Sequence, residues 1–217
     1  MWRLPMIAAL EVLTFLGIPA HSDAAGRQVL LIQPLGRELP HEEVAVVRQA
    51  LVGFYNVQIR VLPRVDLPEQ AYYGPRRRYR AEILLPFLLE KLPSDGDRIL
   101  GLTGVDISTD KGDIKDWGIL GKANLGGKEC LVSAFRCHKR ATEGASPSIL
   151  LAKVAVHEVG HTLGLDHCTK RGCLMEDARG QLRTCERAFD ICTHCRAQLK
   201  ASGFVLPEQP NIPWPRP

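Results

Sequence analysis

Apolar and polar residues are distributed along the chain in segments of two kinds. Short apolar runs favour buried strands, whereas apolar positions that recur at a helical period over ten or more residues favour helices. Strands are expected at residues 29–35, 57–63, 98–108, 117–123 and 130–136, and helices at 41–55, 79–92 and 147–163. Because strands and helices alternate, the sequence predicts an α/β fold in which helices pack on a mixed, mostly parallel, twisted sheet.

The last of these helices has clear start and stop signals. Ser146 is a good N-cap, and Pro147 suits the first helical position. Gly164 ends the helix, since glycine readily adopts the left-handed conformation of a C-terminal cap. An apolar stripe at roughly helical period runs through Ile149, Ala152, Val156, Gly160 and Leu163. The chain can therefore turn at Gly164 and return toward the end of the helix.

Three histidines follow at spacings that suit one metal ion. His157 and His161 are four residues apart, so they share one face of the helix, about 6 Å apart along its axis. His167 can return as a third ligand after the turn at Gly164, which leaves one coordination position open, as in a catalytic zinc site. Glu158 can reach a water molecule on such an ion. The pattern predicts a zinc ion on three histidines with a carboxylate beside it.

Two other interpretations of the histidines are open. An HExxH motif occurs by chance on ordinary buried helices, although chance accounts poorly for all five fixed positions together. A different class of metallopeptidase takes a glutamate as third ligand, and Glu186 lies at a possible distance from His161 in the sequence. His167 is the better placed ligand, because it follows the helix-ending glycine by three residues.

Four cysteines directly behind the histidines form a second candidate metal site. Cys168 and Cys173 make one close pair, and Cys192 and Cys195 make a CxxC pair further along. Four thiolates in two close pairs are the usual ligand set of a closed structural zinc. Two disulfides, or free thiols, are the alternative. A metal ion there would hold together the segment after His167, which has few apolar residues to bury.

Residues 157–195 together resemble the signature of the archaemetzincins, a family of metzincin zinc peptidases. The matching pattern is HExxHxxGxxHCx4CxM followed by CxxC, with one residue fewer between Met175 and Cys192 than in the family pattern. The resemblance implies a metzincin-like fold, a catalytic zinc on the histidines, a second zinc on the four cysteines, and Met175 in a turn beneath the catalytic site. A weaker likeness extends upstream to about Gln28 and covers most of the chain.

The resemblance also gives the strand at 117–123 a role. Gly118 and Gly121 weaken an interior strand and suit an edge that another backbone approaches. In metzincins an edge strand lines the cleft and pairs with extended substrate, and backbone pairing is a common way to bind peptides. An ordinary edge strand is the alternative.

The predicted activity is hydrolysis of peptide bonds. Zinc lowers the pKa of bound water and polarises a carbonyl, and Glu158 would accept the proton of that water and pass it to the leaving amine. The sequence shows no clear donor to the developing oxyanion, since all four tyrosines lie far upstream and Glu176 follows Met175. The alternative is a weakly active or inactive zinc protein that binds peptides or a protein partner. The presence of Glu158 argues against this alternative, because an inactive homologue would often have lost the base.

Composition is that of an ordinary globular protein. The chain has 217 residues, 45% hydrophobic and 24% charged, enough for one domain with its own core. We expect this domain at 26–206, divided into 26–165 and a cysteine-rich lower part at 166–206, with a loose proline-rich tail at 207–217.

The net charge of +4 is too small to indicate a nucleic-acid partner. We expect a monomer that meets a peptide or protein substrate. The densest basic run, residues 76–80, is expected to be the solvated start of a helix.

The first 25 residues are expected to precede the folded domain. Arg3 is followed by an apolar run to Ala20, and Ser22 and Ala24 fit the small residues of a signal-peptidase site. The run is short for a stable membrane span. A signal peptide and export to a periplasmic or secreted location are favoured, although Glu11 is unusual inside such a run. A cytoplasmic protein with an N-terminal extension is the alternative, and archaemetzincins are commonly intracellular.

Three further cysteines bring the total to seven, an odd number that excludes a full set of internal disulfides. If 130–136 is one strand, Cys130 and Cys137 lie roughly 23 Å apart at 3.3 Å per residue. A disulfide needs Cα atoms about 5.5 Å apart. We therefore expect this pair to stay unbridged, and the sequence assigns no role to Cys185.

Overall fold

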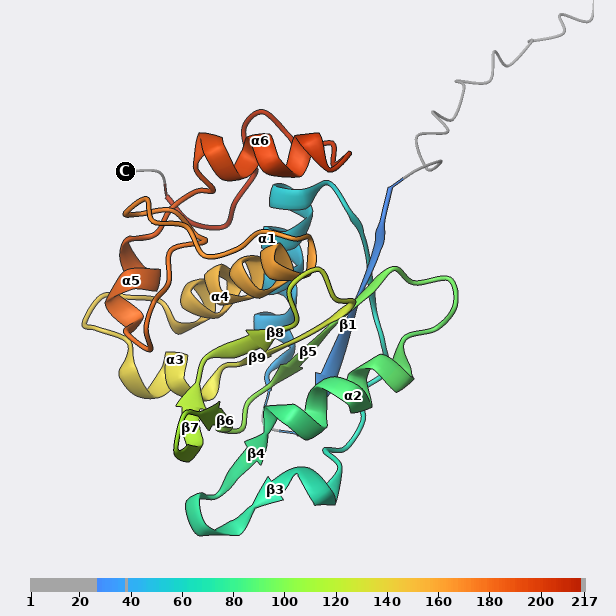
Figure 1. The fold of residues 1–217 in the computed structure, drawn as a ribbon, viewed down its shortest axis with the longest axis vertical. Helices are drawn as coiled ribbons and strands as arrows, with labels where there is room; N and C mark the ends of the chain where they lie inside the picture. The colour runs from blue at the N-terminus through green and yellow to red at the C-terminus, as the bar shows by residue number, and fades with distance from the viewer. Residues whose placement is uncertain (1–26, 38, 216–217) are drawn as a thin grey trace, which may run out of the picture.

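Two sheets organise the part of the chain that this computed structural model describes, residues 27–37 and 39–215. The larger sheet consists of β1 (Val29–Leu35), β2 (Gln58–Val61), β5 (Arg98–Thr103), β8 (Gly121–Ala123) and β9 (Glu129–Ser133). The smaller sheet consists of β3 (Tyr72–Tyr73), β4 (Arg78–Arg80), β6 (Ile107–Lys111) and β7 (Ile114–Ile119). The helices are α1 (His41–Tyr55), α2 (Ala81–Lys91), α3 (Phe135–Arg140), α4 (Pro147–Thr162), α5 (Leu182–Arg187) and α6 (Thr193–Ala201) (Figure 1).

The larger sheet has the strand order β2-β1-β5-β9-β8. Its first four strands are parallel, and β8 pairs antiparallel with β9 at one edge. This arrangement confirms the predicted α/β fold with a mixed, mostly parallel sheet. The smaller sheet, of order β3-β4-β6-β7, was not foreseen.

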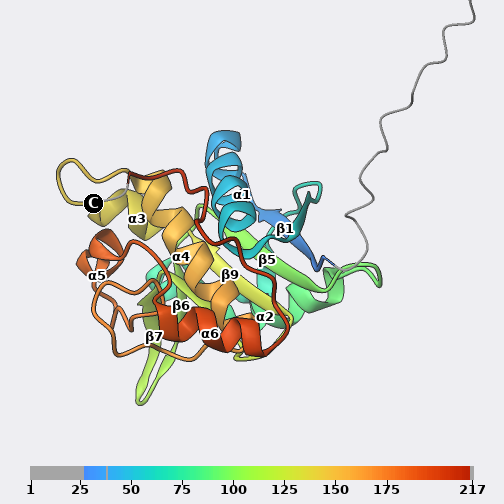
Figure 2. The same cartoon turned by 90° about the horizontal axis from the view of Figure 1, so that it is seen from above.

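Helices cover both faces of the larger sheet. In β1, Leu30 and Ile32 belong to the core formed with α1 and α4, whereas Leu31 and Leu35 belong to a second core formed with α2. The same alternation in β5 and β9 follows from the strand period of two residues. α1 and α4 therefore pack side by side on one face of the sheet, and α2 covers the opposite face (Figures 1 and 2).

Two expected strands are each divided between the sheets. The strand predicted at 98–108 is β5 of the larger sheet followed by β6 of the smaller one. The strand predicted at 117–123 is the end of β7 followed, after Leu120, by β8. The prediction was wrong in both places because an apolar run has the same pattern whether or not its chain changes sheet.

The strand expected at 130–136 is also shorter than predicted. β9 ends at Ser133, whose Oγ accepts a hydrogen bond from the backbone N–H of Phe135 at 3.2 Å, and α3 begins at that residue. Cys137 therefore lies in a helix, and the extended spacing expected between it and Cys130 is wrong. Both are buried and free in this structure.

The basic run at 76–80 is not the start of a helix. It contains the end of a short 3₁₀ turn (Gly74–Arg76) and then β4, and α2 begins only after it. Arg78 and Arg80 point away from free solvent, since each side chain is 19% exposed and forms ion pairs. Pairing with acidic residues distant in the sequence explains why charge density alone misplaced this segment.

The proline-rich segment packs on the domain over its described part, 207–215. Trp214 is 5% exposed and stacks on Phe54 of α1 with ring centroids 5.6 Å apart. Its Nε1–H donates to the carbonyl of Phe189 at 3.1 Å. The expected loose tail is therefore wrong for these residues, because one large aromatic side chain offsets the lack of regular structure.

The segment predicted to be a signal peptide or extension lies outside the described residues. Among the helices of the described residues, none is long and apolar enough to cross a membrane.

Candidate active site and cysteine cluster

α4 carries the first two histidines and begins and ends as the sequence predicts. Ser146 caps it by accepting a hydrogen bond from the N–H of Ile149 at 3.5 Å. After the last helical turn, Gly164 adopts φ +90°, which an L side chain rarely adopts. The chain then reverses and returns His167 toward the helix.

The three histidines converge. Their candidate ligand atoms all lie within 4.8 Å of one another, and the Nε2 atoms of His157 and His161 are 3.0 Å apart. The Nδ1–H of His157 donates to Leu174 O at 2.6 Å, and the Nδ1–H of His161 donates to Leu165 O at 2.7 Å. Because a carbonyl can only accept, these bonds leave both Nε2 lone pairs free to face the same point.

This donor set fits a zinc ion. Zinc takes imidazole nitrogens at about 2.0–2.1 Å, which places neighbouring nitrogens a little over 3 Å apart. Burial is the main cause that lowers the pKa of His157 to about 4, and burial also lowers the pKa of His161. Both imidazoles are therefore neutral at pH 7, the form that binds a metal.

Glu158 lies beside the triad, enclosed by protein. Its residue is 7% exposed, and β8 passes so close that a Cβ on Gly121 would lie 2.6 Å from its Cγ. Burial raises the pKa of Glu158 to about 8, and the charge of Lys122 opposes that shift. A carboxyl group so placed can take up and give back a proton near neutral pH.

Met175 lies beneath α4, fully buried. A Cβ on Gly160 would be 2.6 Å from its Sδ, so glycine at this position lets the methionine approach the helix backbone. Tyr55 packs at the same place and donates from its hydroxyl to Val156 O at 2.6 Å. This tyrosine therefore supports α4 from behind and does not face the cleft.

A cleft with a volume of ≈ 270 Å³ opens in front of His157 and Glu158. One wall comes from the end of β7 through Gly121, and the opposite wall comes from residues 174–188. Trp117 to Gly121, the first part of the strand expected to line the cleft, do line it, whereas sequence reasoning missed Lys153. For Lys153 a signal existed, since it precedes His157 by one helical turn and so shares its face.

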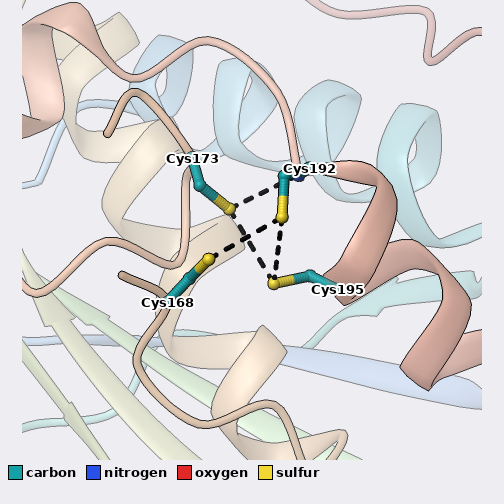
Figure 3. A group of neighbouring side chains, drawn as sticks. All are labelled: Cys168, Cys173, Cys192 and Cys195. Carbon is teal, nitrogen blue, oxygen red and sulfur yellow. Dashed lines mark hydrogen bonds between the residues drawn. The ribbon is translucent and has the colours of Figure 1, made fainter. Parts of the chain in front are cut away.

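The four cysteines also meet at one point, with their side chains directed toward each other (Figure 3). The Sγ atoms of Cys168 and Cys192 are 3.7 Å apart, those of Cys173 and Cys195 are 3.9 Å apart, and those of Cys192 and Cys195 are 3.6 Å apart. A tetrahedral zinc with Zn–S of about 2.3 Å needs sulfur atoms about 3.8 Å apart. The cluster fits such an ion, and all four residues are free cysteines, which opposes the alternative of two disulfides.

The alternative third ligand does not join the histidines. Glu186 lies in α5, where its Oε1 accepts a hydrogen bond from the N–H of Thr142 at 3.1 Å. It is absent from the group of described residues whose ligand atoms converge, which consists of His157, His161 and His167.

Comparisons with known proteins agree with this geometry. The model of the family described as Peptidase family M54 matches residues 43–201. An archaemetzincin from Methanocaldococcus jannaschii is 29% identical over 182 residues, which cover 82% of this chain and 96% of that protein.

Solved structures show the same fold. The crystal structure of archaemetzincin from Methanopyrus kandleri matches with a TM-score of 0.70 and 26% identity, over 83% of this chain and 98% of that chain. The structure of archaemetzincin from Archaeoglobus fulgidus, complexed with malonate, matches with a TM-score of 0.65 and 29% identity, over 79% and 99%. Fold, site and relatives together define a metallopeptidase. The chain belongs to peptidase family M54, the family of the archaemetzincins.

Proposed function

We propose that the chain hydrolyses peptide bonds with a zinc ion held by His157, His161 and His167 and with Glu158 as general base. The observation that carries this proposal is the convergence of the three imidazoles beside an enclosed carboxyl group. Zinc bound there supplies a Lewis acid that polarises a carbonyl and makes water acidic enough to lose a proton.

In this proposal a protein side chain, Glu158, transfers the proton of the attacking water. Glu158 accepts it from the attacking water and later gives it to the leaving amine. Contact with Gly121 holds this side chain in place, and the fixed imidazoles behind it keep the site from rearranging during the reaction. Lys122, which donates to the hydroxyl of Thr109 at 2.9 Å, favours the ionised form of the base.

The substrate in this proposal is a peptide lying along the edge formed by the end of β7 and by β8. β8 is the edge strand of the larger sheet, and residues 117–121 line the cleft. An extended peptide can pair with such an edge through backbone hydrogen bonds.

The cysteine cluster holds a second zinc ion with a structural role. Its sulfur separations fit a closed tetrahedral site with no position for substrate. It holds residues 168–195 in place behind the histidines.

The substitution Glu158→Gln tests the catalytic role. We expect purified wild-type protein and the variant to contain close to two zinc ions each, because the amide leaves all seven proposed ligands intact. Both proteins are incubated with a peptide library, and the products are identified by mass spectrometry. Wild-type protein should cleave some of the peptides. The variant should cleave none, because an amide cannot take the proton. An active Glu158→Gln protein would exclude this residue as the base.

Metal removal provides a separate check. A mild chelator should extract one zinc ion first and abolish hydrolysis, since the histidine site has an open position and the four-thiolate site is closed. Protein that holds a single zinc ion when isolated, with disulfides among Cys168, Cys173, Cys192 and Cys195, would refute the second site.

A further inference from the structure

A second hollow adjoins the candidate cleft. It has a volume of ≈ 300 Å³ and shares Trp117, Gly118 and Gly180 with the cleft. The charged residues that line it are Arg76, Arg78, Asp116 and Arg136. We call it the arginine pocket. Because the two hollows have walls in common, a peptide that occupies the cleft can extend into the arginine pocket.

Positive charge is in excess at the arginine pocket. Asp106 accepts hydrogen bonds from Arg136 at 2.8 and 3.1 Å and from Arg78 at 2.8 Å. Asp116 lies 3.4 Å from Nη1 of Arg78 and 3.3 Å from Nε of Arg76. Three guanidinium groups therefore share two carboxylates, so this network carries a net charge of about +1.

Donors also remain available. Within residues 27–37 and 39–215, Nη1 of Arg136 and Nη2 of Arg78 donate to no protein acceptor, since the bonds of these side chains use other atoms. The two side chains are only 8% and 19% exposed. A carboxylate that enters the pocket would meet N–H groups that are fixed and partly shielded from water, where charge-assisted hydrogen bonds are stronger than at an open surface.

Gly118 brings one of these guanidinium groups against the edge strand. A Cβ on Gly118 would lie 1.7 Å from Nη2 and 2.9 Å from Nη1 of Arg136. The arginine head thus occupies the space in which a side chain of the strand would stand. Charge is presented directly beside the backbone along which the proposed substrate lies.

The spacing of two glycines sets the distance to the cleaved bond. Gly121 contacts Glu158, and Gly118 contacts Arg136. Three residues of fully extended chain would span roughly 10 Å, and the bend at Leu120 between β7 and β8 makes this an upper limit. Antiparallel pairing, the more stable kind, places the part of the peptide near Gly118 on the C-terminal side of the bond that lies near Gly121.

We propose that the arginine pocket binds a carboxylate of the substrate, within about three residues on the C-terminal side of the cleaved bond; this inference rests on the proposed peptidase function. The carboxylate belongs to an acidic side chain or to the C-terminus of a short peptide. If the arginines served only to join β4, β6 and β7, the substrate would show no charge preference there.

Matched peptides test the preference. With zinc-loaded protein, kcat/KM is measured for peptides that carry Glu, Gln or Lys at positions two to four after the cleaved bond. We expect Glu to exceed Gln about tenfold at one of these positions, as for a hydrogen-bonded charge, and Lys to be poorest. Peptides that end at this position with a free or an amidated C-terminus show which carboxylate is used. Equal rates for Glu and Gln at every position, with no effect of amidation, would overturn the proposal.

Reversal of one charge in the arginine pocket tests whether the pocket causes the preference for Glu in the substrate. Arg76 is the most suitable residue because its side chain is 63% exposed and has one ion-pair partner, so Arg76→Glu should leave the fold intact. This variant should lose the preference for Glu and gain one for Lys. Arg77→Glu is the matched control, since Arg77 is exposed, carries the same charge and does not line the pocket. Equal effects of the two variants would also overturn the proposal.

Binding separates this proposal from the peptidase function. Titration of the Glu and Gln peptides into zinc-loaded Glu158→Gln protein should show about tenfold tighter binding of the Glu peptide. Addition of Arg76→Glu to the Glu158→Gln protein should abolish this difference in affinity. If the wild-type protein cleaves no peptide, the hydrolytic function fails while this titration still decides the arginine pocket. Equal affinities would refute the pocket even in an active enzyme.

Discussion

At the scale of single residues, two glycines, one in β7 and one in β8, decide how closely other side chains approach. Gly118 leaves room for the guanidinium of Arg136, and Gly121 leaves room for Glu158. Neither has a positive φ, so their conformations do not require glycine. Space, and not backbone conformation, is the reason for glycine at both positions.

The variant Gly121→Ala should reduce hydrolysis by at least about tenfold, because displacing a reacting group by 1 Å commonly costs this much or more. The new Cβ would lie 2.6 Å from both Cγ and Oε1 of Glu158, and that side chain has little free space to move into. Zinc content should be unchanged, as measured by elemental analysis. Gly74→Ala is the control, since its nearest neighbour would be 4.0 Å away. Full activity of Gly121→Ala would show that the base does not depend on this contact.

Residues close together in the sequence were the predictable part of the site. His157, Glu158 and His161 occupy one helical face, and the cysteine pairs are separated by two to four residues, so local geometry limits where their side chains can go. The bonds between Arg136 and Asp106 span 30 residues, and the chain between them passes from the smaller sheet to the larger one. No periodic pattern encodes such a contact, and sequence reasoning did not find it.

At the scale of elements, α4 and the segment that follows it are stabilised in different ways. α4 is held by burial, since eleven of its residues are buried and it packs against the larger sheet and α1. The segment 168–195 contains only short helices and isolated bridges. Its four cysteines meet at one point, and we expect this cluster, and not a separate hydrophobic core, to hold the segment together.

Removal of one ligand from each metal site should therefore have different consequences. His161→Ala should lose zinc and activity with a small change in stability. Cys192→Ala should lower the melting temperature further, since structural zinc contributes on the order of 10 kcal/mol in isolated zinc-finger peptides. Activity should then fall indirectly, because Leu174 O orients His157.

Thermal melts and limited proteolysis of both variants measure the difference. New cleavage sites between residues 168 and 195 are expected only for Cys192→Ala. A fully active Cys192→Ala protein as stable as His161→Ala would mean that the cysteine cluster does not hold this segment.

Element boundaries were predictable where one signal acted alone. Ser146 and Gly164 marked both ends of α4 because a cap and a left-handed residue act locally. The ends of β5 and β7 were missed because each precedes a change of sheet, which is a tertiary event. The smaller sheet could not be foreseen for the same reason.

At the scale of the whole molecule, the C-terminal segment connects parts of the chain that the sequence keeps far apart. Trp214 stacks on Phe54 of α1 and bonds to the carbonyl of Phe189, which follows α5. The carbonyl of Pro207 accepts a hydrogen bond from Arg196 of α6 at 3.1 Å. These contacts link the helical layer to the cysteine-rich segment.

Trp214→Ala should therefore destabilise the protein by about 3 kcal/mol, the lower end of the usual cost of removing a buried tryptophan. Urea denaturation of zinc-loaded protein measures the change. Val205→Ala is the control; Val205 is 75% exposed, so its substitution should change stability by less than about 0.5 kcal/mol. Equal stability of the two variants would show that the segment is as loose as its composition suggests.

The segment between Met175 and Cys192 lines the candidate cleft but contains none of the proposed metal ligands. All proposed metal ligands lie before or after it, and a hydrogen bond from Leu174 N–H to Asp190 O closes its base at 3.0 Å. Much of one cleft wall comes from this stretch, including Asp177, Gly180, Thr184 and Ala188. Surface connections of this kind accept insertions and deletions readily. A change of length here would therefore reshape the entrance for substrate while leaving every proposed metal ligand in its place.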